Sequence, residues 1–212
     1  MSELRTQEEL RARYRNPSQI ALRKDIGRID EAASTYIAAS PFVVVASTSD
    51  DGCDASPRGG PPGFVAVLDE HRVAIPDLAG NNRLDTLGNL VAHPQVGLLF
   101  FVPGIDESLR VNGRATVTDD AAVLDACVVD GRRPRVAVVV DVEQCYIHCA
   151  KAFRRAGMWE PSSWLPVDER PKPECILQEH LAWEAGADNV REVLEQGYEA
   201  TMWEVGGRSS EE

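Results

Sequence analysis

The sequence lacks an apolar run long enough to cross a bilayer, and residues 1–16 are charged throughout, with no signal-peptide pattern. These absences predict a cytoplasmic protein. Basic residues are also scarce: 22 Lys and Arg face 34 Asp and Glu, which gives a formal net charge of -12. Affinity for nucleic acid or for an anionic membrane needs clustered Lys and Arg, so we expect neither partner. One small phosphate can still find a local basic pocket.

Paired cysteines and the common catalytic signatures are missing too. The five cysteines are odd in number and scattered, which indicates free thiols in a reducing compartment rather than a disulfide framework. Cys145, His148 and Cys149 lie close together, but no second ligand pair accompanies them, so we predict no metal site. The sequence contains no Gly-x-Ser-x-Gly elbow, no Walker-type phosphate loop and no Gly-x-Gly-x-x-Gly after a strand.

The patterns that are present divide the chain into three parts. Residues 1–40 read as a helical extension that packs on the barrel, beginning with a capping box from Thr6 to Glu9. Residues 41–158 contain β-branched runs with short connections, which favour an antiparallel barrel of six or seven strands over a parallel sheet. Residues 159–212 form a Trp- and Pro-rich segment followed by one helix over about 176–194. The predicted strands cover residues 42–46, 63–68, 73–75, 96–102, 109–117 and 135–146, with Gly113 expected at a bulge or a close backbone approach.

Two segments combine glycine and arginine next to predicted strands. In residues 54–63, Ser56 and Arg58 precede two glycines, which suits either an ordinary surface loop or a cradle for an anion. In residues 75–85, a strand leads into a small-residue loop and then into a helix predicted over Arg83 to Val91. Arginine at a helix N-terminus opposes the helix dipole, so a bound anion would explain Arg83. The alternative is an ordinary N-cap with Arg83 in solvent.

A third segment, residues 145–155, follows the last predicted strand. Lys151 is a candidate site residue, because the strand before it can bring it to the same face of the barrel as Arg58 and Arg83. His148 reads more simply as a packed or hydrogen-bonded residue than as a catalyst.

Taken together, these motifs resemble the FMN-binding split barrels related to pyridoxamine 5'-phosphate oxidase, in a bacterial subgroup of FMN-dependent enzymes. The resemblance rests on motifs that occur in the same order: Ser56-Pro57-Arg58-Gly59, Pro76-Asp77, Gly80-Asn81-Asn82-Arg83, residues 93–100, residues 109–115 and His148-Cys149-Ala150-Lys151-Ala152. It implies a cofactor site for FMN built from Ser56, Arg58, Gly59, Pro76, Asp77, Asn81, Asn82, Arg83 and Lys151. It also implies a homodimer that covers the flavin, with Lys151 near the ring.

The resemblance stops short of a substrate. Pyridoxamine-phosphate oxidases carry a basic, aromatic C-terminal segment that grips the substrate phosphate, and this chain has Trp183 and Glu184 in an acidic helix instead. We therefore expect an FMN-dependent oxidoreductase acting on a small organic substrate other than vitamin B6 phosphate, with no catalytic residue assigned. The alternatives are a non-catalytic flavin carrier or sensor, a relative that binds haem or a deazaflavin, and a purely structural or interaction module.

Overall fold

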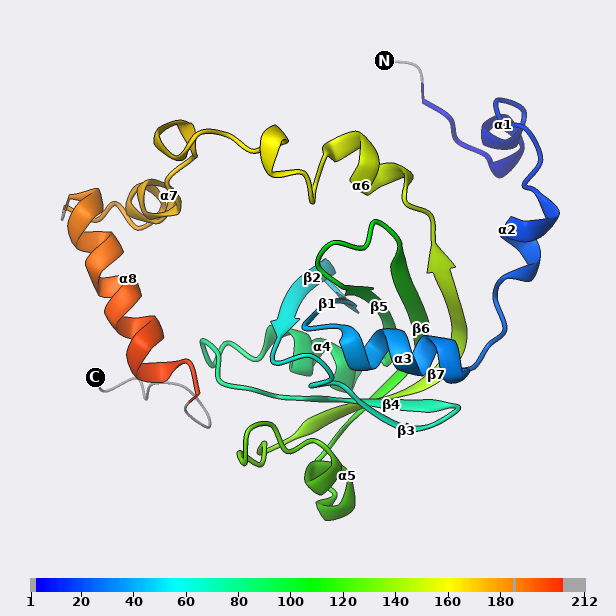
Figure 1. Cartoon of the computed structure of the whole chain (residues 1–212), viewed down its shortest axis with the longest axis horizontal. Coiled ribbons are helices and arrows are strands. Elements are labelled where there is room, and N and C mark those ends of the chain that lie inside the picture. Colours follow the sequence, from blue (N-terminus) through cyan, green and yellow to red (C-terminus); the bar gives the residue numbers. More distant parts are fainter. Residues whose placement is uncertain (1–2, 185, 204–212) are drawn as a thin grey trace.

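A computed structural model describes residues 3–184 and 186–203 of this chain (Figure 1). The strands are β1 (Phe42–Ser49), β2 (Gly52–Gly59), β3 (Ala66–Asp69), β4 (Arg72–Pro76), β5 (Gln95–Phe101), β6 (Ser108–Thr118) and β7 (Ala137–His148). The helices are α1 (Gln7–Arg11), α2 (Gln19–Arg23), α3 (Glu31–Ala39), α4 (Asp85–Ala92), α5 (Ala121–Ala126), α6 (Lys151–Ala156), α7 (Pro173–His180) and α8 (Ala187–Thr201), with short 3-10 turns η1 (Pro161–Ser163) and η2 (Val167–Glu169).

All seven strands belong to one sheet in the order β2-β1-β5-β6-β7-β4-β3, and every neighbouring pair is antiparallel. The sheet curls, so that β3 and β4 lie across the core from β1 and β2 (Figure 1). This arrangement confirms the predicted class, a mainly β protein with flanking helices and an antiparallel barrel.

Alternation along the strands fills the core. Val43 and Val45 of β1, Leu98 and Phe100 of β5, and Val111 of β6 all lie on the inward side and are buried. Helix α3 packs against β3 and β6 and contributes Ile37 and Ala33 to the same core. Asp30 begins this helix by accepting a hydrogen bond from the Ala33 N–H at 2.8 Å.

The predicted special role of Gly113 is confirmed. The pairing of β6 with β7 shifts register between Asn112 and Gly113, which is a β-bulge. A Cβ atom at position 113 would overlap the carbonyl oxygen of Asp141 on β7. Only glycine permits this close approach of the two backbones.

Two of the predicted elements are wrong. No strand was predicted between residues 46 and 63, and residues 54–63 were interpreted as a surface loop or an anion cradle, but residues 52–59 form β2, which pairs with β1 over its whole length. The predicted C-terminal helix over 176–194 is instead two helices, α7 and α8, which pack on each other. The chain turns between them at Ala182, which has a left-handed backbone with φ of 47°.

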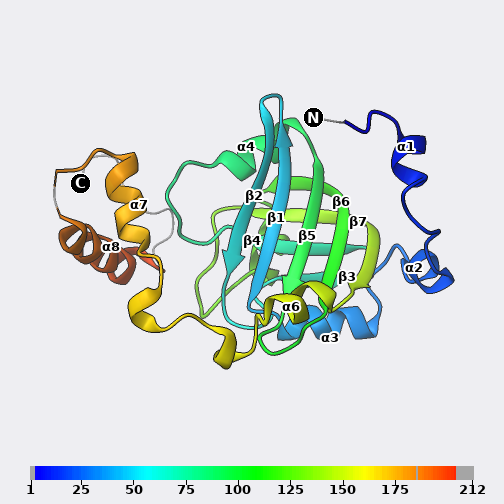
Figure 2. The same ribbon diagram turned by 90° about the horizontal axis from the view of Figure 1, so that it is seen from above.

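No helix of the described residues covers the outer side of β2, β1 and β5 over most of its length (Figure 2). We call this surface the open face. It is formed by the outward side chains of Phe42, Val44, Ala46, Ala55, Pro57, Leu99 and Phe101. At one end, Phe153 of α6 contacts Phe101, with ring centroids 5.5 Å apart, and Trp159 stacks on Phe153.

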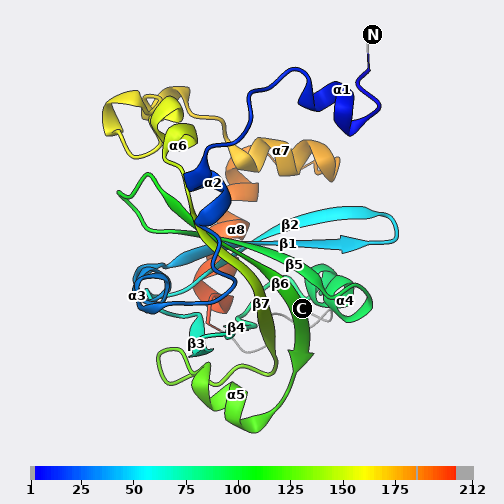
Figure 3. The same cartoon turned by 90° about the vertical axis from the view of Figure 1, so that its right-hand side faces the viewer.

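The two ends of the described chain extend away from the barrel as arms over most of their length, and each contacts the barrel at one end, through Lys24 at Ile147 and through Trp203 at Arg132. We call residues 3–24 the N-terminal arm and residues 173–203 the C-terminal arm. Helices α1 and α2 bury no residue. The arms lie on opposite flanks of the open face (Figure 2), and the side view in Figure 3 also shows α1 and α7 standing clear of the sheet.

Candidate functional site

A cavity of about 390 Å³ lies between β2 and the segment that leads from β4 into α4. Its walls come from two stretches of the chain that are far apart in sequence. They are Asp54, Ser56, Pro57, Arg58 and Gly59 on one side, and residues 77–87 on the other.

The β2 wall follows from strand alternation. Asp54, Ser56 and Arg58 pair with the inward-facing residues Ser47, Val45 and Val43 of β1, so all three point to the inner side of the sheet. Because β2 is the last strand at this edge, its inner side meets the 77–87 segment rather than another strand. Arg58 donates through Nη1 to Ser56 Oγ at 2.6 Å and to the Pro57 carbonyl oxygen at 2.8 Å, which holds its guanidinium beside the cavity.

The opposite wall is built mainly from backbone. Asn82 and Leu84 both have left-handed backbones, with φ of 56° and 60°, a conformation that is unfavourable for leucine. Leu84 occupies the N-cap position of α4, and no side chain caps the helix. The N-cap residue thus offers no side-chain acceptor to the first N–H groups of α4, which lie at the end where the helix dipole is positive. Such an end can receive an anion.

Charged groups of both signs surround this backbone. The Arg83 side chain is 72% exposed and its Nε lies 2.8 Å from Asp85 Oδ2. Thr86 Oγ1 donates to Asp54 Oδ2 at 3.1 Å, which ties α4 to β2 across the cavity. The carboxylates of Asp54 and Asp85 are thus already engaged by protein donors, whereas Arg58 contacts only neutral oxygen atoms in the hydrogen bonds described above.

Asp77 is the remaining acid of the cavity. Its backbone N–H donates to the Val136 carbonyl oxygen at 3.0 Å, which fixes the loop to the chain segment before β7. Burial raises the pKa of its carboxyl group, and the positive charge of Arg58 partly opposes that rise. Asp77 is therefore easier to protonate than an exposed aspartate.

The structure brings together seven of the nine predicted site residues: Ser56, Arg58, Gly59, Asp77, Asn81, Asn82 and Arg83. Pro76 is buried at the end of β4 and lines a small recess behind the cavity together with Arg58 and Asp77. Lys151 does not line the cavity; it opens α6 at the end of the open face. Sequence reasoning missed two lining residues: Asp54, which lies inside the segment 54–63, and Thr86, which lies one residue beyond the segment 75–85.

His148 also lies outside the cavity. Its Nδ1 atom is buried and has no hydrogen-bond partner in the part of the chain that the structure describes. Burial, followed by the charges of Arg110 and Lys24, lowers the pKa of its imidazole. These effects favour the neutral form of the ring.

The structure also bears on two other kinds of site considered from the sequence, a cysteine nucleophile and a metal site. Burial raises the pKa of the Cys127 and Cys145 thiols to about 11, so neither is an activated nucleophile. Among residues 3–184 and 186–203, no group of three or more His, Cys, Asp or Glu side chains is arranged to hold a metal ion. No helix within these residues has the length and apolar character needed to cross a membrane.

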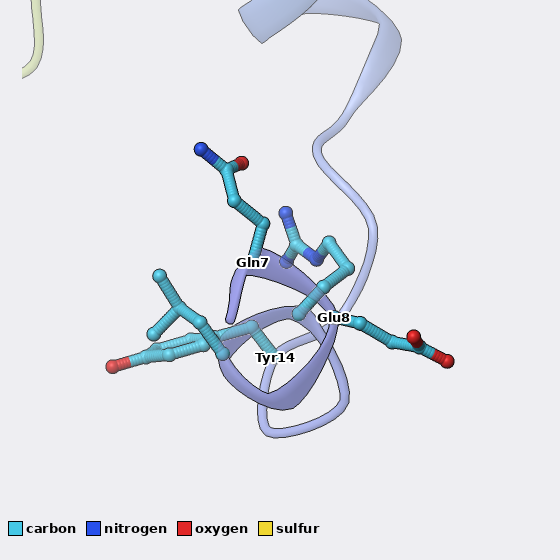
Figure 4. Close-up of a pocket in the computed structure, with 5 residues that line it drawn as sticks. Gln7, Glu8 and Tyr14 are labelled. Carbon is cyan, nitrogen blue, oxygen red and sulfur yellow. The ribbon is translucent and has the colours of Figure 1, made fainter. Parts of the chain in front are cut away.

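A hollow of about 680 Å³ lies on the N-terminal arm (Figure 4). It is lined by Gln7, Glu8, Leu10, Arg11 and Tyr14, all from α1 and the turn that follows it. A single short helix cannot enclose a ligand, so we do not regard this hollow as a cofactor site.

Comparison with known proteins identifies the class of this barrel. The family model described as pyridoxamine 5'-phosphate oxidase matches residues 29–149, which is more than half of the chain. The chain therefore belongs to the pyridoxamine 5'-phosphate oxidase family, and the predicted split-barrel fold is confirmed. A search of curated proteins finds no match.

Several solved structures are similar to the barrel. HupZ from Group A Streptococcus is 17% identical, with a TM-score of 0.46, and the match covers 56% of this chain and 93% of that one. An FMN-binding protein from Syntrophomonas wolfei is 9% identical, with a TM-score of 0.45 and coverage of 57% and 86%. General Stress Protein 26 from Bacillus anthracis is 13% identical, with a TM-score of 0.42 and coverage of 54% and 88%.

Proposed function

We propose that this protein binds FMN, with the phosphate of the cofactor in the cavity between β2 and α4, and that it acts as an oxidoreductase on a small organic molecule. The observation that carries the proposal is the uncapped N-terminus of α4 facing Arg58 across the cavity. A phosphate needs several donors and a positive potential, and this site supplies both from two independent segments. The volume of about 390 Å³ lies within the range of roughly 300–1,000 Å³ usual for small-molecule sites.

Each residue of the cavity has a definite part in this proposal. Arg58 presents a planar fork to the phosphate, and Ser56 keeps that fork in place. Arg83 is exposed enough to leave Asp85 for a stronger anion, since exposed ion pairs contribute only about 0–1 kcal/mol. The left-handed backbone at Asn82 and Leu84 directs the chain so that α4 begins at the cavity.

The bound flavin would supply the electron-transfer chemistry, while the protein positions substrate and excludes water. Burial raises the pKa of the Asp77 carboxyl group, which favours its protonated form beside the proposed cofactor.

We further propose that the protein is a homodimer formed through the open face. A sheet face with Val44, Leu99 and Phe42 on its outer side leaves apolar area in water, and a twofold partner would cover it. Lys151 lies outside the cavity of its own chain. We therefore include it in the cofactor site only as a residue contributed by the second copy.

Haem is a poorer fit for the cavity. The chain has four histidines, His71, His93, His148 and His180, and none of them lines the cavity. An axial ligand for iron would have to come from elsewhere, whereas the groups that are present suit a phosphate.

The first test is an absorption spectrum of the purified protein, followed by heat release and mass identification of any chromophore. We expect FMN at about one per chain. Replacing Arg58 by Ala should weaken FMN binding roughly 10- to 100-fold, the scale of one lost charge-assisted contact. The matched control is Arg28→Ala, which removes an exposed ion pair with Glu70 outside the cavity and should leave affinity unchanged.

A colourless protein that takes up no FMN on titration would overturn the proposal. A deazaflavin or haem spectrum would replace FMN with another cofactor. If FMN binds but no reduced nicotinamide nucleotide or other donor supports turnover, the protein is a flavin carrier rather than an oxidoreductase.

A further inference from the structure

Both arms leave large apolar side chains in solvent. On the N-terminal arm, the exposed residues are Leu4, Leu10, Tyr14, Ile20 and Leu22. On the C-terminal arm, they are Ile176, Leu181, Trp183, Val193, Tyr198, Met202 and Trp203. Helices α7 and α8 pack chiefly on each other, and a two-helix hairpin has too little surface to bury these side chains alone.

The two arms carry opposite charge. The N-terminal arm has six basic and three acidic side chains. The C-terminal arm has seven acidic side chains and a single basic one, Arg191. The whole chain has an excess of acid, so a basic arm is a local departure from its composition.

Within the described residues, most of these charges form no ion pair. In the part that the structure describes, Arg11, Arg13, Arg15 and Arg23 form no ion pair, and neither do Glu192, Glu195 and Glu199 of α8. Glu192, Glu195 and Glu199 are spaced by three and four residues, so they lie along one side of the helix. The two arms therefore carry charges of opposite sign that form no ion pair within the described residues.

The arms cannot satisfy each other within one chain, because they stand on opposite flanks of the open face (Figure 2). We propose that the N-terminal arm of each copy docks on the C-terminal arm of a second copy of this chain. This inference rests on the dimer suggested under the proposed function. Each docked pair would join apolar side chains and opposite charges that are exposed in the isolated chain.

The charges also select the symmetry axis of that dimer. In a face-to-face pair, the twofold axis lies in the plane of the interface. An axis parallel to the strands exchanges the two flanks, so a basic arm meets an acidic arm at each side. An axis across the strands would place acidic on acidic and basic on basic, which is repulsive. The geometry thus points to an axis along the strands.

The hollow in Figure 4 is a docking position for the second copy in this arrangement. Leu10 and Tyr14 line it and belong to the unpaired apolar surface of the arm. In the dimer, it would receive apolar side chains from the C-terminal arm of the second copy.

The first experiment reverses charge on each arm of the full chain and measures the dimer dissociation constant by sedimentation. The N-terminal variant is Arg11→Glu/Arg13→Glu/Arg15→Glu, and the C-terminal variant is Glu192→Lys/Glu195→Lys/Glu199→Lys. Each variant should raise the dissociation constant at least 10-fold, and combining all six substitutions should restore most of the loss. Net charge alone cannot produce this pattern, because the first variant makes the chain more acidic and the second makes it less so. If the second variant dimerises more tightly than the unaltered protein, or the combination fails to recover, the proposal is wrong.

The second experiment locates the contact directly. Isotope-labelled and unlabelled copies carrying Arg13→Lys are mixed, treated with a zero-length carbodiimide reagent, and digested for mass spectrometry. We expect peptides from residues 3–24 joined to peptides from residues 173–203, with one partner labelled and the other not. Cross-links found only within one copy, or only between two N-terminal arms, would overturn the proposal.

These results separate failure of the inference from failure of the proposed function. A monomer that binds FMN would remove the dimer and the arm exchange together while leaving the cofactor site. A dimer whose strength is unaffected by either charge reversal would remove the arm exchange alone.

Discussion

Val43 in the barrel and Ile20 in the N-terminal arm are both β-branched aliphatic residues, yet Val43 is completely buried and Ile20 is 80% exposed. Fully burying such a side chain contributes about 1.5–3 kcal/mol, so the barrel gains this free energy many times over and the isolated arms forgo it. The arms also lack the long-range strand pairing that makes the barrel cooperative. The comparison indicates that packing stabilises the barrel, whereas the large apolar side chains of the arms stay exposed in the isolated chain.

The largest effect should come from two glycine substitutions that compare a barrel strand with an arm helix. Gly113→Ala places a Cβ against the Asp141 carbonyl, so we expect a loss of about 3 kcal/mol in unfolding free energy. Gly197→Ala in α8 meets nothing within 4 Å and should instead stabilise that helix by about 0.5–1 kcal/mol. Urea unfolding of the barrel measures the first effect, and hydrogen exchange of the α8 backbone amides measures the second. Equal tolerance at the two positions would contradict the comparison.

A smaller effect is expected at the cavity, where the barrel carries local strain. Leu84 is exposed and has a φ of 60°, so Leu84→Gly removes an unfavourable backbone conformation at little cost in packing. We expect a gain of about 1 kcal/mol in unfolding free energy. Leu87→Gly in the same helix is the control and should destabilise, since that residue packs on the core. A loss of stability in Leu84→Gly would show that the side chain matters more than the backbone.

Removal of residues 173–212 should have a still smaller effect on the barrel. The C-terminal helices pack chiefly on each other, so we expect the unfolding free energy of the barrel to change by less than about 1 kcal/mol under conditions where the protein is monomeric. Urea unfolding at low protein concentration tests this expectation. A drop of several kcal/mol would show that the arm is part of the barrel core.

The smallest effect concerns the pH dependence that Asp77 introduces. Burial raises its pKa in the folded state, so the native protein holds this proton more tightly than the unfolded chain. The associated stability is present below the ordinary aspartate pKa near 3.8 and is lost as pH rises through the raised value. Asp77→Asn should therefore become progressively more stable, relative to the unaltered protein, as pH increases from about 4 toward neutrality. Unfolding curves measured in parallel at several pH values give this difference, and a constant difference would exclude the effect.

Much of the barrel could be predicted from sequence because its strands carry their own signals. The apolar runs that became β1, β5 and β7 can be recognised from their own sequence. Strand β2 could not be recognised in this way: its residues, GCDASPRG, have no alternating apolar pattern, and it is extended because β1 pairs with it. The turn at Ala182 was also hidden, since no glycine or proline marks it.

Several residues that line the cavity could be picked out from the sequence, whereas the contact that joins its two walls could not. Arg58 and Arg83 were identified because each stands beside glycine or helix-start signals. Thr86 and Asp54 were missed, since a hydrogen bond between residues 32 positions apart leaves no local pattern. The position of Lys151 depends on the path of α6 after β7, and strand periodicity does not determine that path.

Strand β2 has a second consequence, which concerns solubility. It is one of the two edge strands of the sheet, and such edges can add strands from other molecules and start aggregation. Pro57 has no N–H to donate to an added strand, and the adjacent Arg58 carries a charge. The strand that supplies the proposed phosphate site is thus also protected against edge-to-edge growth. A substitution made only to change ligand binding, such as Pro57→Val, should therefore be tested for aggregation as well as for binding.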